Sequence, residues 1–157
     1  MTAPAPQTAE SPALGITQLM VAENFIRGME SLRHILRKGT LAPNPSALPA
    51  ARLYEDMLPL TFQVYACCDA SLGAIKKLAG ADVPKWPAET ADKSLTLDAL
   101  IAAVDEALVA LRAVDDAALA AADHLGTIHY DIGGYGPMEL PVQNWLLGWS
   151  LPMFMCA

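Results

Sequence analysis

This sequence of 157 residues has few charges. Only 17% of its residues are charged, whereas 54% are hydrophobic, and that balance excludes disorder over most of the chain. The net charge of -7 repels nucleic acid and anionic membranes, so we expect neither as a partner. So apolar a composition instead favours an apolar pocket or an oligomer interface.

Cysteine and histidine are also scarce, with three of each. The odd cysteine number and the adjacent pair Cys67 and Cys68 supply neither a disulfide framework nor a zinc-ligand spacing. Buried, unreactive thiols are the simpler interpretation. His34, His124 and His129 fall on a predicted helix, a loop and a hairpin with no common face. We therefore predict no metal and no other cofactor.

No apolar run is long enough to span a bilayer, and the chain does not start with a basic and apolar leader. Residues 1–13 are rich in proline, alanine and threonine, so we predict a disordered tail there. Residues 14–157 suit a single domain. We expect a cytoplasmic protein.

Helical periodicity dominates the sequence that is left. Apolar residues recur at steps of three and four, the pattern of amphipathic helices. We predict four such segments, over residues 14–38, 46–78, 94–113 and 142–157. Pro59 predicts a kink or a short break near residues 57–59 of the second segment, and Pro152 predicts a kink or an early end of the fourth.

One segment has a different period. Ile128, Tyr130 and Ile132 alternate with polar residues, and glycines follow at positions 133, 134 and 136. Alternation followed by a glycine-rich turn is typical of a β-hairpin. The predicted fold class is therefore all-α, an up-and-down four-helix bundle with a small β-hairpin before the last helix.

Three motifs resemble a known family. Residues 51–64, ARLYEDMLPLTFQV, resemble the signature of the family called domain of unknown function 1993. The LAG at residues 78–80 with the following VP, and the LLG at residues 146–148 with the following LP, resemble its next landmarks in the same order. The resemblance spans residues 14–157 and implies a DinB-like four-helix fold. That superfamily includes metal-dependent enzymes that transfer or isomerise thiol-linked substrates through three histidines.

A polar set lies on or beside the second predicted helix. Steps of seven and six place Asp56, Gln63 and Asp69 roughly in line if the helix is continuous through Pro59. Arg52 is one turn away from Asp56 and close enough to pair with it. A structural network at the kink and a ligand-facing polar cluster both fit this pattern.

Two other pairs are candidates for a site. His129 and Asp131 project from the same face of a strand, an arrangement in which a carboxylate can orient an imidazole that acts as a general base. The alternative is that both residues lie on the solvent-exposed face of the hairpin. Trp145 and Trp149 are four residues apart, which suits the floor of an aromatic pocket or plain core packing.

Three functions follow from these patterns. The leading hypothesis is a small-molecule-binding bundle protein, or a cofactor-free isomerase, cyclase or lyase acting on a small apolar substrate. The resemblance implies a metal-dependent DinB-like thiol transferase or isomerase, and the third hypothesis is a non-catalytic homodimeric interaction protein. The candidate catalytic residues are Asp56, His129 and Asp131, and the candidate ligand-binding residues are Arg52, Tyr54, Gln63, Tyr65, Asp69, Trp145 and Trp149.

Overall fold

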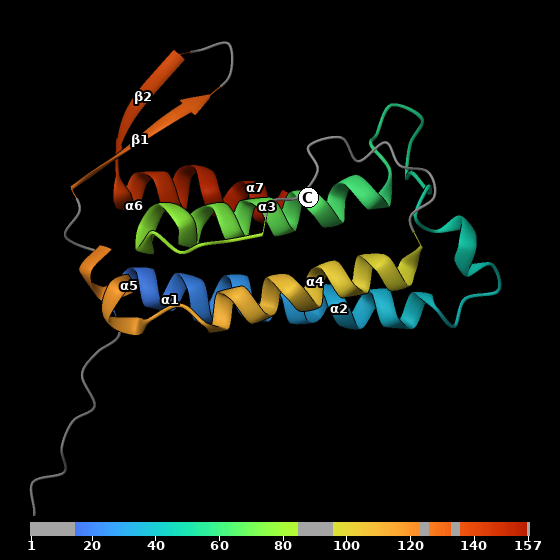
Figure 1. Ribbon diagram of the computed structural model, residues 1–157. Helices are drawn as coiled ribbons and strands as arrows, with labels where there is room; N and C mark the ends of the chain where they lie inside the picture. The colour runs from blue at the N-terminus through green and yellow to red at the C-terminus, as the bar shows by residue number, and fades with distance from the viewer. Residues whose placement is uncertain (1–14, 85–95, 123–125, 133–135, 157) are drawn as a thin grey trace, which may run out of the picture.

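Two layers, each an antiparallel pair of helices, make up the body of the protein, and a hairpin stands at one end (Figure 1). The computed structural model describes residues 15–84, 96–122, 126–132 and 136–156. The predicted tail at residues 1–13 and His124 lie outside these residues. One layer holds the N-terminal helix and α4 (Leu97–Arg112), and the other holds α3 (Leu60–Ala79) and the C-terminal helix (Figure 1). The predicted helical bundle with a hairpin before its last helix is confirmed.

The N-terminal helix is continuous but changes its winding. It comprises α1 (Ile16–Leu19), the π-helical segment η1 (Met20–Ile26) and α2 (Arg27–Gly39), close to the predicted range. This helix contributes the side chains of Phe25 and Met29 to the core, and both are fully buried. The wider turn of η1 was not predicted, because a single inserted residue hardly alters the periodicity of the sequence.

The second helix starts later than the sequence predicts. Between Pro45 and Pro59 the only helical turn is a short 3-10 segment, η2 (Pro45–Ala47), and α3 begins at Leu60 directly after Pro59. Proline lacks a backbone N–H and disfavours helical geometry in the residue before it, so the break at Pro59 is complete. The loop is fixed to the first turn of α3, because the Thr61 hydroxyl donates to the Pro49 carbonyl at 2.8 Å.

The third predicted helix is confirmed as α4; residues 94 and 95, where its start was predicted, lie outside the described residues. Thr96 caps it, with Oγ1 accepting from the Ala99 N–H at 3.2 Å. A short helix that was not predicted, α5 (Asp116–Ala122), follows. The predicted hairpin is also confirmed, as β1 (Thr127–Ile132) paired antiparallel with β2 (Gly136–Pro141).

The C-terminal helix runs through Pro152. It comprises α6 (Val142–Trp145), the π-helical segment η3 (Leu146–Ser150) and α7 (Leu151–Cys156). The predicted disturbance at Pro152 takes the form of the wide turn η3 just before it, where the Leu151 N–H reaches back five residues to the Leu146 carbonyl. Proline interrupts the regular ladder of hydrogen bonds, and a π-turn is one way to accommodate it.

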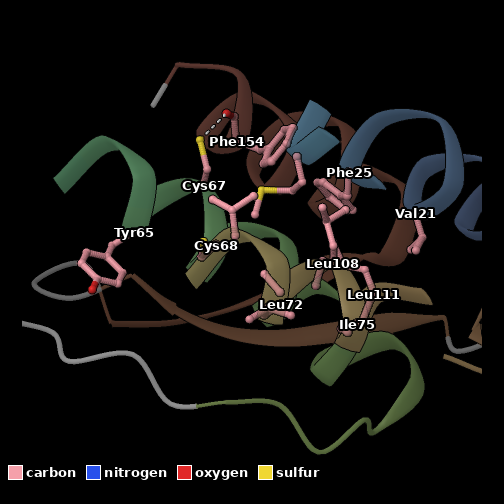
Figure 2. Packing of buried hydrophobic residues seen from close by; sticks show 14 of the residues in the cluster. Val21, Phe25, Tyr65, Cys67, Cys68, Leu72, Ile75, Leu108, Leu111 and Phe154 are labelled. Carbon is pink, nitrogen blue, oxygen red and sulfur yellow. Dashed lines mark hydrogen bonds between the residues drawn. The ribbon is translucent and has the colours of Figure 1, made fainter. Parts of the chain in front are cut away.

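The core lies between the two layers and centres on an aromatic pair (Figure 2). The Phe25 and Phe154 rings meet edge to face, with centroids 5.2 Å apart. Leu72, Ile75 and Leu108 are at most 1% exposed. None of the described helices is both long and apolar enough to cross a membrane.

Candidate functional site

Three aromatic side chains meet where the hairpin joins the C-terminal helix. The Tyr130 ring of β1 lies 6.1 Å from the Trp145 ring of α6 and 5.4 Å from the Trp149 ring of η3, between ring centroids. We call Tyr130, Trp145 and Trp149 the aromatic corner. Trp145 is buried, whereas Tyr130 and Trp149 are half-buried. The corner therefore joins a closed interior to the protein surface.

Strand geometry explains how Tyr130 reaches this position. Side chains two apart on a strand share a face, and Ile128 is buried on the face that Tyr130 shares. Lys77, in the last turn of α3, lies on the outer side of the corner. Its Nζ is 5.1 Å from the centroid of the Tyr130 ring and donates to the His129 carbonyl at 3.4 Å. This contact joins α3 to the hairpin.

Two buried polar atoms beside the corner have no hydrogen-bond partner among the described residues. They are Trp145 Nε1 and Ser150 Oγ, and each side chain belongs to a residue that is 3% exposed. Residues five apart differ by about 140° around an α-helix. The π-turn η3 lies between these two and narrows that angle, so both reach the inward side of the same helix.

An unpaired donor in this position is costly. A buried polar group without a partner costs about 1 to 3 kcal/mol, and native structures rarely leave one without a reason. The indole N–H is only a donor, whereas a serine hydroxyl both donates and accepts. Trp145 and Ser150 therefore each offer a buried donor to an acceptor oxygen.

The loop residues of the predicted site lie elsewhere. Tyr54 and Asp56 are exposed, and Tyr54 retains 72% of its accessible surface. Arg52 is exposed too and donates from Nη1 to the Met57 carbonyl at 2.8 Å. The expected pairing of Arg52 with Asp56 over one helical turn is not formed, because this segment is not helical.

The remaining predicted residues of the second helix point in different directions. Gln63 is half-buried and donates to the Leu58 carbonyl at 3.3 Å, whereas Asp69 is exposed and Tyr65 is buried. In Figure 2, Tyr65 lies apart from the Phe25 and Phe154 rings. The line through Asp56, Gln63 and Asp69 does not exist, because α3 begins only at Leu60.

The hairpin pair is exposed, and a third residue joins it. His129 lies directly opposite Glu139 in the register, with Nδ1 3.3 Å from Oε1. Asp131 lies opposite Pro137 and is exposed. Sequence reasoning missed Glu139, Tyr130 and Ser150. Glu139 could have been found from the length of the turn, because the turn length sets which residues lie opposite each other across the hairpin, and Glu139 lies opposite His129.

The comparisons with known proteins agree with this fold. The profile of the family described as Domain of unknown function (DUF1993) matches residues 19–155. The chain belongs to this family. The crystal structure of a DinB family member protein from Shewanella denitrificans is similar to it, with a TM-score of 0.71 and 21% sequence identity over 90% of this chain and 79% of that chain. At that identity the likeness shows the fold alone. No curated protein matches this DUF1993 chain.

The described residues of this DUF1993 protein do not fit the three-histidine metal site that a DinB-like fold implies. His34 is exposed on α2 and His129 is exposed on β1, and these two elements lie apart (Figure 1). Within the described ranges, no group of three or more His, Cys, Asp or Glu side chains is placed to hold a metal ion.

The buried thiols of the DUF1993 chain are poor nucleophiles. Burial raises the pKa of Cys67 to about 11. Burial, followed by the neighbouring Cys67 and Asp69, raises the pKa of Cys68 to about 12. The Cys67 thiol contacts the Phe154 carbonyl at 3.7 Å (Figure 2). Because only the thiolate attacks readily, both side chains act as small core residues, in agreement with the sequence.

Proposed function

We propose that this DUF1993 protein binds a small molecule with an apolar body and a carbonyl-type oxygen at the aromatic corner. The observation that supports the proposal is the indole Nε1 of Trp145, a buried donor that has no partner among the described residues and lies next to two half-buried rings. Small-molecule sites commonly combine apolar walls with a few polar groups that fix orientation. Trp145 and Ser150 would supply the polar groups, and Tyr130 and Trp149 the walls.

The chemistry of the ligand follows from two properties of Trp145 and Ser150: both can donate a hydrogen bond, and neither is charged. Two donors facing inward favour an acceptor oxygen, and no charged side chain accompanies them on this helix, because residues 142–157 contain none. Lys77, the cation that contacts the Tyr130 ring, is exposed to solvent, so a neutral ketone, ester or amide oxygen fits the buried donors better than a carboxylate. Both polar atoms are closed off from solvent, so the ligand enters only when a covering side chain moves. We propose that the side chain that moves is the half-buried ring of Trp149.

The proposal is a binding function rather than catalysis. Isomerisation or elimination next to a carbonyl requires a base beside the donors. His129 and Asp131 alternate with Tyr130 along β1, so their side chains leave the opposite face of the strand. Asp56 lies in the loop before α3, whereas Lys77 approaches the corner from the other end of that helix. None of the three candidate catalytic residues shares the corner.

A matched pair of probes tests this function. The compounds 2-acetylnaphthalene and 2-ethylnaphthalene have similar shape, and only the first carries a carbonyl oxygen. We expect calorimetry to show about tenfold tighter binding of the acetyl compound, the ratio that one hydrogen bond of about 1.4 kcal/mol provides. Trp145→Phe keeps a ring and removes the N–H, so the preference should disappear.

Trp149→Phe is the control for that substitution. It changes an indole at the half-buried edge of the corner and should keep the preference for the acetyl compound. If neither naphthalene binds, the small-molecule function is wrong. If both bind equally to the wild-type chain, the corner binds apolar molecules but the proposed recognition of an oxygen is wrong.

A further inference from the structure

From Trp145 onward, the C-terminal helix carries apolar residues on both its inward and its outward side. Trp145, Leu146 and Phe154 are buried against the bundle, and residues 142–157 include no charged side chain. On the outward face, Leu147 is 49% exposed and Met155 is 69% exposed. A helix with apolar residues all round is typical of a buried position. This one has solvent on its outer side.

The outward apolar residues form one continuous line. Successive members of this set are one, three, one and three residues apart, so their side chains lie on one face of the helix. We call this set the outer stripe: Leu147, Gly148, Leu151, Pro152 and Met155. Met153, 49% exposed, projects from another side of the helix.

Gly148 lies in the wide turn η3, four residues before Pro152, and is exposed. A Cβ at this position would meet no described atom within 4 Å. Glycine in a helix interior is destabilising relative to alanine. Its advantage is that another backbone approaches closely, and the open side of Gly148 belongs to the outer stripe.

The opposite layer of the bundle is different. Its helices α2 and α4 carry ion pairs at their surface, with Arg33 Nη1 2.9 Å and Arg37 Nη2 3.5 Å from the carboxylate oxygens of Asp105. Arg112 of α4 also pairs with Glu30 of α2. Ion pairs thus lie on the surface of the layer that holds α2 and α4, whereas the C-terminal helix, in the other layer of Figure 1, carries no charged side chain.

We propose that the outer stripe is the interface of a homodimer, in which the C-terminal helices of two copies pack against each other about a two-fold axis. The argument is one of charge. Two copies that each carry a net charge of -7 repel each other least where their surfaces are uncharged. A two-fold axis brings the same patch of both copies together, so an uncharged stripe meets a stripe of equal polarity and length.

The size of the stripe sets the expected strength. The stripe offers five residues, whereas a standard interface uses roughly 20 to 30 residues on each side. The dimer should therefore be weak, with a dissociation constant in the micromolar range, about 1 to 100 μM. At lower concentrations the protein should be a monomer.

Sedimentation velocity of the full chain across that range tests the dimer. We expect the wild-type protein to shift from monomer to dimer as its concentration rises. Met155→Glu places two carboxylates in the interface and should weaken the dimer at least tenfold. Val109→Glu is the matched control, because Val109 is 67% exposed on α4 in the other layer, and it should dimerise as the wild type does. Thermal melts should show that both variants fold.

Three results would overturn the proposal. One is a wild-type chain that stays monomeric at the highest concentration. Another is equal dimerisation by the Met155→Glu and Val109→Glu variants. The third is a monomeric wild type that binds neutral phosphatidylcholine vesicles through Met155, which would make the stripe a membrane contact. The aromatic corner is independent of this test, because Trp145→Phe leaves the stripe intact.

Discussion

Replacing Gly28 by alanine tests how the C-terminal helix sits on the N-terminal helix. A Cβ at Gly28 would lie 2.5 Å from Phe154 Cε1 and 2.6 Å from Cζ, closer than carbon atoms normally approach. The ring of Phe154 packs against Phe25 in the core, so it cannot move without losing that contact. Alanine is favoured over glycine in a helix by about 1 kcal/mol, whereas overpacking costs about 1 to 3 kcal/mol. We expect a net loss of about 1 kcal/mol of unfolding free energy.

Two comparisons isolate the clash. Gly73→Ala on α3 adds a Cβ that meets nothing within 4 Å, so it should stabilise the protein by up to about 1 kcal/mol. In a Phe154→Ala background, which itself costs about 3 to 5 kcal/mol, Gly28→Ala should also become stabilising. Urea unfolding followed by circular dichroism measures all four variants. If Gly28→Ala stabilises the wild-type chain as much as Gly73→Ala does, the close packing of Phe154 against Gly28 is wrong.

Three further outcomes concern buried groups. A thiol reagent should modify the exposed Cys156 quickly, and Cys67 and Cys68 only on unfolding, since the latter two are buried; equal rates would contradict this. Burial raises the pKa values of the two thiols in the folded protein to about 11 and 12, from an ordinary value of 9.0. Above pH 9 the unfolded chain therefore loses these protons first, so the free energy of unfolding falls as the pH rises. At about pH 10 the loss is on the order of 1 kcal/mol per thiol, and a Cys67→Ala/Cys68→Ala variant should lack it. Thr61→Val should cost about 1 kcal/mol in urea unfolding, and Thr40→Val, which removes an exposed hydroxyl bond, should cost much less.

Local periodicity was sufficient for most of the helices and for the hairpin. The apolar steps of α4 place Leu100, Val104 and Leu108 on one face, and all three are at most 1% exposed. Alternation around Tyr130 identified β1. Both patterns are properties of neighbouring residues, because each period follows from the backbone geometry of a single element.

The start of the second helix shows where this reasoning failed. Apolar residues between Leu48 and Leu58 continue a helical spacing, yet Pro59 ends any helix before it. Residues 48–58 instead form a loop tied back to α3 through Thr61. The site residues expected in that segment, Tyr54 and Asp56, are therefore exposed.

The sequence by itself determined the all-helical class, the hairpin and the inward faces of its helices, because these depend on residues within a few positions of each other. Only the tertiary structure decided that Phe154 packs over Gly28 and that Tyr130 meets Trp149. It also decided that Trp145 Nε1 is buried without a partner within the described chain. These contacts join separate elements, and how two layers pack depends on the shapes of both surfaces together, which no local period encodes.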